Sequence, residues 1–394
     1  MDESVKARYD AWIASEMAEI WDISKYIHAN PELGFQEEKA CRIQCEYLKQ
    51  KGFDILQPVN DLNSAFVASF GNGAPVIAVF SEYDALKGLG HACGHNLIAA
   101  SAILTGAAVK KYLEENDVKG TIKVFGTPAE ESGGGKIKML EKGVFSGVDA
   151  VFMMHPTSDK TRMAGACMSN MSLRVVFKGV SAHAGSHPDN GRNALSAANL
   201  YLNAVGLWRQ HFKADMRVNH FVEYGGEMTN SIAEKVILKG ELRSFRLKEL
   251  HWLEKVMREC AHGCAQAMGC TVDFYAEEGY QGRVPNAALS DLCRREFEKL
   301  QEPMLDGMPD DYGGEDLGNV SRHIPICNPY VTIFPDHKIS GHTDQFRELA
   351  VSQAGYRCIE MTGKAMTRSI IELLNSPDVL AKAKDELKQR IERE

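Results

Sequence analysis

The chain has 394 residues, of which 44% are hydrophobic and 25% charged, and its formal net charge is −8. These values are ordinary for a folded globular protein with room for two domains. The acidic balance, with no basic stripe, argues against nucleic acid as a partner. Small and polar residues interrupt the longest apolar run, 97–109, so we expect a buried core helix there and no contact with a membrane.

Residues 1–6 are charged and lead directly into a helical pattern, so we expect no signal peptide and a cytoplasmic protein. The ten cysteines form no regular framework, and pairs such as Cys41 and Cys45 have helical spacing. Reduced thiols fit this usage, and Cys93 is the one candidate for chemistry.

The first part of the chain alternates between helical and strand patterns. The strand candidates are apolar without period-two alternation, which indicates a parallel sheet covered by helices on both faces. We expect helices at about 4–28, 36–51, 96–116 and 136–142, and strands at 64–70, 75–80, 121–125 and 149–154.

The pattern changes near residue 170, where partial period-two strands and two long helices indicate a compact α+β insert. From about Val284 the α/β pattern returns. We expect strands at 172–177, 234–243 and 271–275 with helices at 192–212 and 248–268, and then helices at 286–299, 353–375 and 378–393 and a strand at 330–334. The sequence therefore predicts an α/β domain formed by 1–170 and 284–394, interrupted by an α+β domain at 171–283.

The segment His91–Asn96 contains two imidazoles and a thiol immediately before a helix rich in small residues. A thiolate and an imidazole two positions apart suit a transition metal better than a packing role. Because ligands bind beyond the carboxyl ends of strands in open parallel sheets, other ligands are expected after other strands. Four expected strands run into such residues. They lead to Cys93 and His95, to Glu130 and Glu131, to His155, and to His342.

Each of these residues alone is more simply read as a loop side chain, whereas four occurrences at one edge indicate a site. Cys93, His95, Glu131, His155 and His342 are enough ligands for two divalent cations that activate a shared water and polarise a carbonyl. Glu130, next to a ligand, is the candidate general base, and we expect its carboxylate to stay ionised beside the cations.

These residues carry a family resemblance. The motifs His-Ala-Cys-Gly-His-Asn, Pro-Ala-Glu-Glu, His-Pro and Gly-His-Thr occur in an order that resembles the amidohydrolase branch of the aminoacylase/carboxypeptidase metallopeptidases. That branch includes aminobenzoyl-glutamate hydrolases, β-alanyl-lysine dipeptidase relatives and indole-acetyl-amino-acid hydrolases. The resemblance covers nearly the whole chain. It includes the segment His28–Gly34 and the segment Gly179–Gly185 of the insert.

The resemblance implies the same five ligands and Glu130 as the base. It also implies that 171–283 is a ferredoxin-like lid and dimerisation domain of a homodimer. In such a dimer, His183 reaches the active site of the neighbouring subunit. Asn230 and Arg243 fall on substrate-binding positions of the family, and Arg246 stands close enough to Arg243 to be an alternative.

The chain departs from the commoner family pattern at two positions. Asn96 stands where many relatives have Asp, which favours the aminobenzoyl-glutamate and dipeptidase-like subgroup. We expect Asn96 to cap the following helix and to orient a ligand. Ala233 replaces a frequent Pro, which leaves the pose of Asn230 open. Asp84 is a candidate for orienting His95 from behind the metal site. The role of Asp316 is open.

The sequence thus predicts a metal-dependent amidohydrolase that cleaves the amide bond between an acyl or aminoacyl group and an amino acid. One alternative is a dipeptidase for free β-alanyl or γ-aminobutyryl-type dipeptides. The other is a metal-binding scaffold without turnover, which an intact Glu130 disfavours. A thiolate ligand argues for zinc, and the imidazole and carboxylate ligands also admit manganese, cobalt or nickel.

Overall fold

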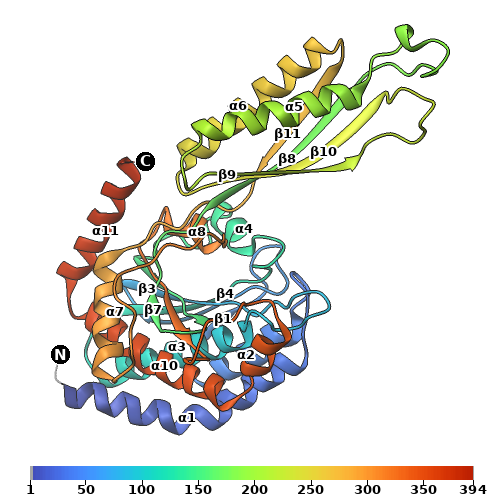
Figure 1. The fold of residues 1–394 in the computed structure, drawn as a ribbon. Coiled ribbons are helices and arrows are strands. Elements are labelled where there is room, and N and C mark those ends of the chain that lie inside the picture. The colour runs from blue at the N-terminus through green and yellow to red at the C-terminus, as the bar shows by residue number, and fades with distance from the viewer. Residues whose placement is uncertain (1–2, 394) are drawn as a thin grey trace. The chain divides into compact units, whose positions relative to one another are not determined.

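The computed structural model describes residues 3–393, which divide into two compact units (Figure 1). The first unit contains the residues up to Ala166, together with Val284–Asp311 and Glu315–Arg393. The second contains Cys167–Arg283 and Tyr312–Gly314.

The first unit is built on a six-stranded sheet. Its strand order is β1 (Asp54–Leu56), β2 (Phe66–Asn72), β4 (Gly120–Gly126), β3 (Val76–Ser81), β5 (Ala150–Phe152) and β12 (Ile326–Cys327). The pairings from β4 to β12 are parallel, whereas β1–β2 and β2–β4 are antiparallel. The parallel strands are short and almost completely buried, as their largely apolar sequences predict.

Alternate residues of each strand enter two different cores. In β3, Ile77 and Val79 pack in the larger core with the helices at Glu3–Ala29, His95–Glu115 and Gln353–Leu374. Ala78 and Phe80 pack in a smaller core with the helices at Gly135–Glu141 and Leu317–Ser321. The sheet is therefore covered on both faces, and the predicted α/β class is confirmed (Figure 1). The helices of this unit are α1 (Glu3–Ala29), α2 (Glu38–Gln50), α3 (His95–Glu115), α4 (Gly135–Glu141), α7 (Ala287–Lys299), α8 (Leu317–Ser321), α9 (Asp344–Leu349), α10 (Gln353–Leu374) and α11 (Pro377–Glu392).

The strand expected at 330–334 belongs to a different sheet from the other expected strands of the α/β domain, although it lies directly beside the segment that carries His155. It forms β13 (Pro329–Thr332), between β6 (His155–Thr157) and β7 (Arg162–Met163) in a three-stranded sheet. The short β12 takes the place at the end of the main sheet. Its two apolar residues, Ile326 and Cys327, are too few to give a periodic signal.

The second unit is built on a four-stranded antiparallel sheet with the order β11 (Thr271–Glu278), β8 (Ser169–Lys178), β10 (Lys235–Ser244) and β9 (Arg217–Tyr224). Two helices pack on it around a separate core that includes Phe177, Tyr201 and Leu253. The chain order β-α-β-β-α-β gives the predicted ferredoxin-like arrangement. Its elements are β8 (Ser169–Lys178), η1 (Pro188–Asn190), α5 (Ala194–Trp208), η2 (Arg209–His211), β9 (Arg217–Tyr224), β10 (Lys235–Ser244), α6 (Leu247–Ala267) and β11 (Thr271–Glu278).

Strand β9 was not predicted because only Val218 of its eight residues is buried. It lies at the edge of the sheet, where one backbone edge and most side chains face away from the core. Among the helices within residues 3–393, none combines the length and apolar character that crossing a bilayer requires.

A half-buried histidine in this unit predicts a pH-dependent stability. His220 Nε2 lies 2.9 Å from the Tyr201 hydroxyl, and burial, with the nearby Arg209, lowers the pKa of His220 to about 4. The folded-state pKa therefore lies below the unfolded value of about 6.5, so the stability gained above pH 6.5 is lost as the pH falls toward 4. The loss is at most about 3 kcal/mol.

We expect the free energy of unfolding of the wild type to fall more steeply than that of His220→Gln between pH 6.5 and 4. Denaturant unfolding of both proteins at several pH values measures the difference. Parallel curves would show that His220 does not titrate in this way.

Candidate metal centre

The turn before α3 brings the Cys93 thiol and the His95 imidazole to the start of the helix. Gly94 has a left-handed backbone (φ 78°) at the start of the helix, and a Cβ there would lie 2.7 Å from Pro156 Cγ. Glycine therefore lets the Cys93–His95 turn pack directly against the segment that carries His155.

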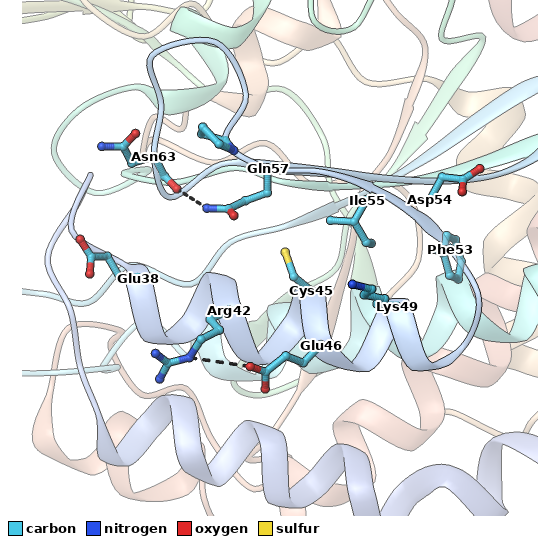
Figure 2. Close-up of a pocket in the computed structure, with 11 residues that line it drawn as sticks. Glu38, Arg42, Cys45, Glu46, Lys49, Phe53, Asp54, Ile55, Gln57 and Asn63 are labelled. Carbon is cyan, nitrogen blue, oxygen red and sulfur yellow. Dashed lines mark hydrogen bonds and ion pairs between the residues drawn. The ribbon is translucent and has the colours of Figure 1, made fainter.

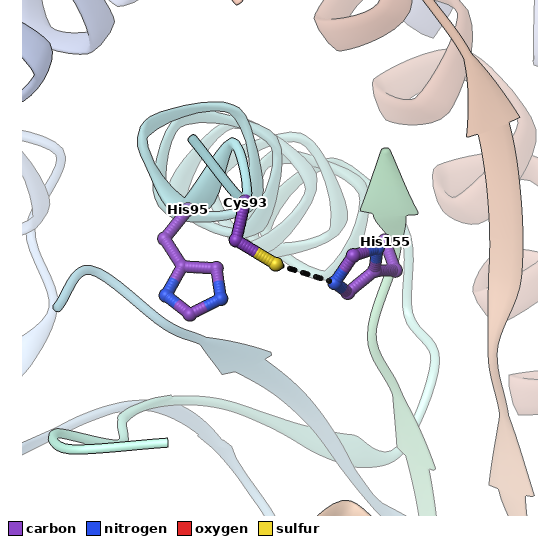
Figure 3. A group of neighbouring side chains, drawn as sticks. All are labelled: Cys93, His95 and His155. Carbon is purple, nitrogen blue, oxygen red and sulfur yellow. Dashed lines mark hydrogen bonds between the residues drawn. The ribbon is translucent and has the colours of Figure 1, made fainter. Parts of the chain in front are cut away.

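Three ligand atoms meet at this turn. The Cys93 Sγ, a His95 nitrogen and a His155 nitrogen all lie within 4.8 Å of one another, and Cys93 Sγ lies 3.4 Å from His155 Nε2 (Figure 3). Figure 3 shows Cys93 and His95 at the start of α3, with the thiol directed toward the His155 ring. The sequence separation of Cys93 from His155 is 62 residues, so the fold assembles this group.

A second group shares the same thiol. Cys93, Glu131 and His342 also have ligand atoms within 4.8 Å of one another, and His342 Nε2 lies 3.4 Å from Glu131 Oε1. His95, Glu130 and Glu131 form a third such group. The structure thus brings the five predicted ligands and Glu130 into one cluster, in which Cys93 belongs to two groups.

Asp84, the residue predicted to orient His95, contacts the ring of His95. One Asp84 carboxylate oxygen lies 3.0 Å from His95 Nδ1, and the other accepts the backbone N–H of Glu131 at 2.9 Å. Burial opposes ionisation of Asp84, but the His95 contacts and this N–H outweigh it and lower the pKa of Asp84 to about 2. The contact of Nδ1 with Asp84 leaves Nε2 as the ring nitrogen that would bind a cation.

The loop after β4 presents the two glutamates from a strained backbone. Ala129 has φ 58°, a left-handed conformation that alanine rarely adopts, and its N–H donates to Glu37 at 2.8 Å. A Cβ on Gly135 would lie 1.7 Å from the Pro128 carbonyl oxygen, so only glycine allows α4 to start there. A strained backbone that is held in place by its surroundings is typical of functional loops.

His342 also has a left-handed backbone (φ 59°). Its N–H donates to the Ala92 carbonyl at 3.0 Å, which joins its loop to the Cys93 turn. Its side chain is 54% exposed, whereas that of Glu131 is only 11% exposed. Hydrogen bonding to Glu131 raises the pKa of His342.

The chemistry of the cluster fits divalent cations. His95 Nε2 is buried without a hydrogen-bond partner, although three carboxylate oxygens surround it. Burial raises the pKa of the Cys93 thiol to about 12 in the metal-free protein. Burial, with the Glu82 and Asp316 carboxylates, also raises the pKa of Glu130. Cations at this place would reverse both shifts, because they stabilise the thiolate and the carboxylate.

Sequence reasoning missed the buried ion pairs behind the cluster. Lys136, on α4, pairs with Glu82 at the end of β3 and with Asp316 before α8, the latter at 2.6 Å. All three side chains are at most 1% exposed. Glu82 follows the expected strand 75–80, and the role of Asp316 was open, but nothing in the sequence paired either residue with a lysine.

The predicted helix-capping role of Asn96 was wrong. Gly94 occupies the cap, and Asn96 lies inside the first turn of α3. Its side-chain amide donates to Ser24 Oγ at 2.9 Å and to the Ala350 carbonyl at 3.2 Å. These bonds join α3 to α1 and to the turn after α9, so the amide of Asn96 connects helices.

His183 and Asn230 lie together in the second unit. The Ala184 N–H donates to the Asn230 carbonyl at 2.9 Å, and His183 pairs with Ser231 in a β-bridge. His183 is exposed, and its Nδ1 accepts the N–H groups of Gly185 and Ser186. The remaining nitrogen, Nε2, therefore carries the proton and is a hydrogen-bond donor.

Arg243 lies at the other end of β10. It lies eight positions along the strand from Lys235, at the end near the His183 and Asn230 loops, which corresponds to roughly 26 Å of strand. Its guanidinium binds Glu241 through two hydrogen bonds of 2.8 and 3.0 Å. Within one chain the structure therefore does not bring Arg243 to His183 and Asn230.

A cavity of about 760 Å³ lies elsewhere on the first unit, between α2 and the β1 segment (Figure 2). Its wall includes Glu38, Arg42 and Cys45 of α2 and Asp54 and Ile55 of β1. None of the predicted site residues lines it, so we do not connect it with the metal cluster.

Comparison with known proteins supports a hydrolytic family. The chain is 32% identical to a Mus musculus "Xaa-Arg dipeptidase" over 413 aligned residues, which cover 100% of this chain and 94% of that protein. It is 31% identical to one of the subunits of the p-aminobenzoyl-glutamate hydrolase of Escherichia coli, over 75% of this chain and 65% of that protein.

Solved structures share the fold. A putative aminohydrolase from methicillin-resistant Staphylococcus aureus has a TM-score of 0.83 at 18% identity and covers 94% of this chain and 100% of its own. A Bacillus subtilis protein described as a dinuclear metal binding peptidase has a TM-score of 0.76 at 21% identity, over 92% and 99% of the two chains. The model of Peptidase family M20/M25/M40 matches residues 78–363, and the chain belongs to this family.

Proposed function

We propose that this protein is a di-metal amidohydrolase that cleaves the amide bond between an acyl or aminoacyl group and an amino acid. The main support for this proposal is that two groups of ligand atoms share the thiol of Cys93. Cys93 belongs to two groups of ligand atoms, one with His95 and His155 and one with Glu131 and His342. Two groups that share one atom suit two neighbouring cations.

In this proposal Cys93, His95, Glu131, His155 and His342 hold the cations. When bound, the cations supply Lewis-acid polarisation of the substrate carbonyl and lower the pKa of a water. A cysteine with two or three nitrogen and oxygen partners favours zinc, and manganese, cobalt and nickel are compatible with the remaining ligands. We further propose a cytoplasmic location, which the reduced-thiol composition supports.

Glu130 moves the proton. Its carboxylate lies 3.9 Å from His95 Nε2, on the edge of the cluster, and its side chain is 12% exposed. From this place Glu130 takes a proton from the attacking water and returns it to the nitrogen of the leaving amine. The exposed Nε2–H of His183 has the polarity needed to stabilise the developing oxyanion.

The relatives named as dipeptidase and aminobenzoyl-glutamate hydrolase support the substrate class. The second candidate, a dipeptidase for free β-alanyl or γ-aminobutyryl dipeptides, is favoured by the full-length similarity to the Xaa-Arg dipeptidase. A panel of N-acyl amino acids, aminobenzoyl-glutamate and free dipeptides, assayed with zinc- or manganese-reconstituted protein, separates the two. Turnover of free-amine dipeptides alone would reject the acyl-amino-acid version, and no amide hydrolysis at all would reject both.

We also propose a homodimer formed through the second unit. The β9 strand is an unpaired sheet edge with Phe221 58% and Val222 48% exposed, and on α5 Leu200 and Leu207 are 39% and 75% exposed. Exposed apolar side chains beside an open edge are typical of an interface. Since His183 and Asn230 lie together, the same partner subunit would supply both, while Arg243 acts within its own chain.

Sedimentation of the wild type and of Leu207→Asp tests the dimer. We expect a dimeric wild type and a monomeric variant that folds but has lost most of its turnover, because the partner's His183 is then absent. A monomeric wild type with full activity would reject the cross-subunit assignment.

A further inference from the structure

His95 Nε2 lies near the carboxylates of Glu82, Glu130 and Glu131, and the proposed function assigns no role to Glu82. This nitrogen is 3.7 Å from Glu82 Oε2, compared with 3.8 Å from Glu131 Oε1 and 3.9 Å from Glu130 Oε2. It is buried and makes no hydrogen bond. Asp84 contacts the other ring nitrogen, Nδ1, at 3.0 Å, so Nε2 is the ring atom that lies toward these oxygens. An imidazole nitrogen grouped with carboxylate oxygens is the kind of donor set that binds a divalent cation.

The other oxygen of Glu82 is anchored. Lys136 Nζ pairs with Glu82 Oε1, and the same ammonium group lies 2.6 Å from Asp316 Oδ1. The Lys136 N–H also donates to Asp316 Oδ2 at 2.9 Å, which fixes the start of α4. Since the three side chains are buried in the first unit, Glu82 is held with Oε1 on Lys136 and Oε2 toward His95.

We propose that Glu82 is a further ligand of the cation site at His95, which it binds through Oε2 while Lys136 retains Oε1. This inference rests on the proposed di-metal function and adds one donor to the five already named. A separation of 3.7 Å suits two donors of one cation, because donor atoms at about 2.0–2.2 Å from a metal lie roughly 3–4 Å apart.

The simpler alternative is that Glu82 only neutralises the buried Lys136. Asp316 provides a matched control, because it pairs with the same ammonium group and is equally buried. Glu82→Gln and Asp316→Asn each leave Lys136 with one carboxylate, so both variants keep a balanced buried pair. A role limited to neutralising Lys136 therefore predicts similar behaviour for the two variants.

The test is a titration of the chelator-stripped full-length proteins with Zn²⁺ in competition with a chromophoric chelator. We expect two Zn²⁺ per wild-type chain. We expect at least about 10-fold weaker binding at one site in Glu82→Gln and less than about 3-fold change in Asp316→Asn. Co²⁺ substitution gives a second readout, since loss of a ligand alters the visible absorption of that ion in Glu82→Gln alone.

Equal Zn²⁺ affinities and equal Co²⁺ spectra in the wild type and Glu82→Gln would overturn the assignment, as would equal weakening in the two variants. If Glu82→Gln does not fold, Glu82→Asp replaces it, because it keeps the charge and shortens the reach by one methylene. We expect weaker Zn²⁺ binding there too, and wild-type affinity would reject the ligand role. A wild type that binds no Zn²⁺ would instead reject the proposed function itself.

Discussion

Replacing Glu130 with Gln should lower kcat by about 10²–10⁴-fold while the bound metal stays at the wild-type amount. The amide is nearly the same size as the carboxylate but cannot accept the proton of the attacking water. Steady-state kinetics on the best substrate of the panel, with metal analysis of the same sample, measures both quantities.

The metal content of the variant distinguishes a role of Glu130 as general base from a role as metal ligand. Glu130 has a ligand atom near those of His95 and Glu131, so a role as ligand is the competing assignment. If Glu130→Gln loses one cation, Glu130 is a ligand and another group must move the proton. Glu141→Gln, on the exposed end of α4, is the matched control and should leave both kcat and metal content unchanged.

Replacing Lys136 with Met should lower the free energy of unfolding by about 3–5 kcal/mol, because two buried carboxylates lose their cation. Burial alone would lower the pKa of Lys136, but Asp316 and Glu82 outweigh it and raise the pKa, which shows how strongly the pair favours the ammonium form. Burial likewise raises the pKa of Asp316, to about 6, despite the contact with Lys136. Denaturant unfolding of the metal-free protein, followed by fluorescence and circular dichroism together, measures the loss.

Two further variants serve as controls for the stability loss expected in Lys136→Met. Lys138→Met alters an exposed lysine of the same helix and should change stability by less than about 1 kcal/mol. Removing all three charges, in Glu82→Gln, Lys136→Met and Asp316→Asn together, should recover much of the loss, since no buried charge is then unpaired. A Lys136→Met protein as stable as the wild type would mean that the carboxylates are neutralised in another way.

The chain is a metallopeptidase of the M20 family, and much of its architecture follows from local sequence patterns. Apolar runs such as 76–80 identify central strands because both faces of these strands are buried. Strand β9 escaped detection because an edge strand with one buried residue has no such run. Strand β12 was not predicted because a strand of two residues is too short to show a periodic pattern.

The residues of the metal cluster were predictable because metal-binding side chains follow several strands, where ligands gather in α/β folds. The partners of these residues were not predictable. Asn96 meets Ala350, which is 254 residues away, and Lys136 meets Asp316, which is 180 residues away. Contacts over such separations depend on how α4, α8 and α9 pack and leave no local signal in the sequence.

In the proposed di-metal site, the shared position of Cys93 would make the enzyme sensitive to oxidants in a particular way. The Sγ atom of Cys93 belongs to the group with His95 and His155 and also to the group with Glu131 and His342. Cys93 is partly accessible to solvent. Oxidation of this sulfur to a sulfenic acid would take a donor from two cations in a single event. Peroxide should therefore release both ions and stop turnover together, and a thiol reductant with fresh metal should restore them together.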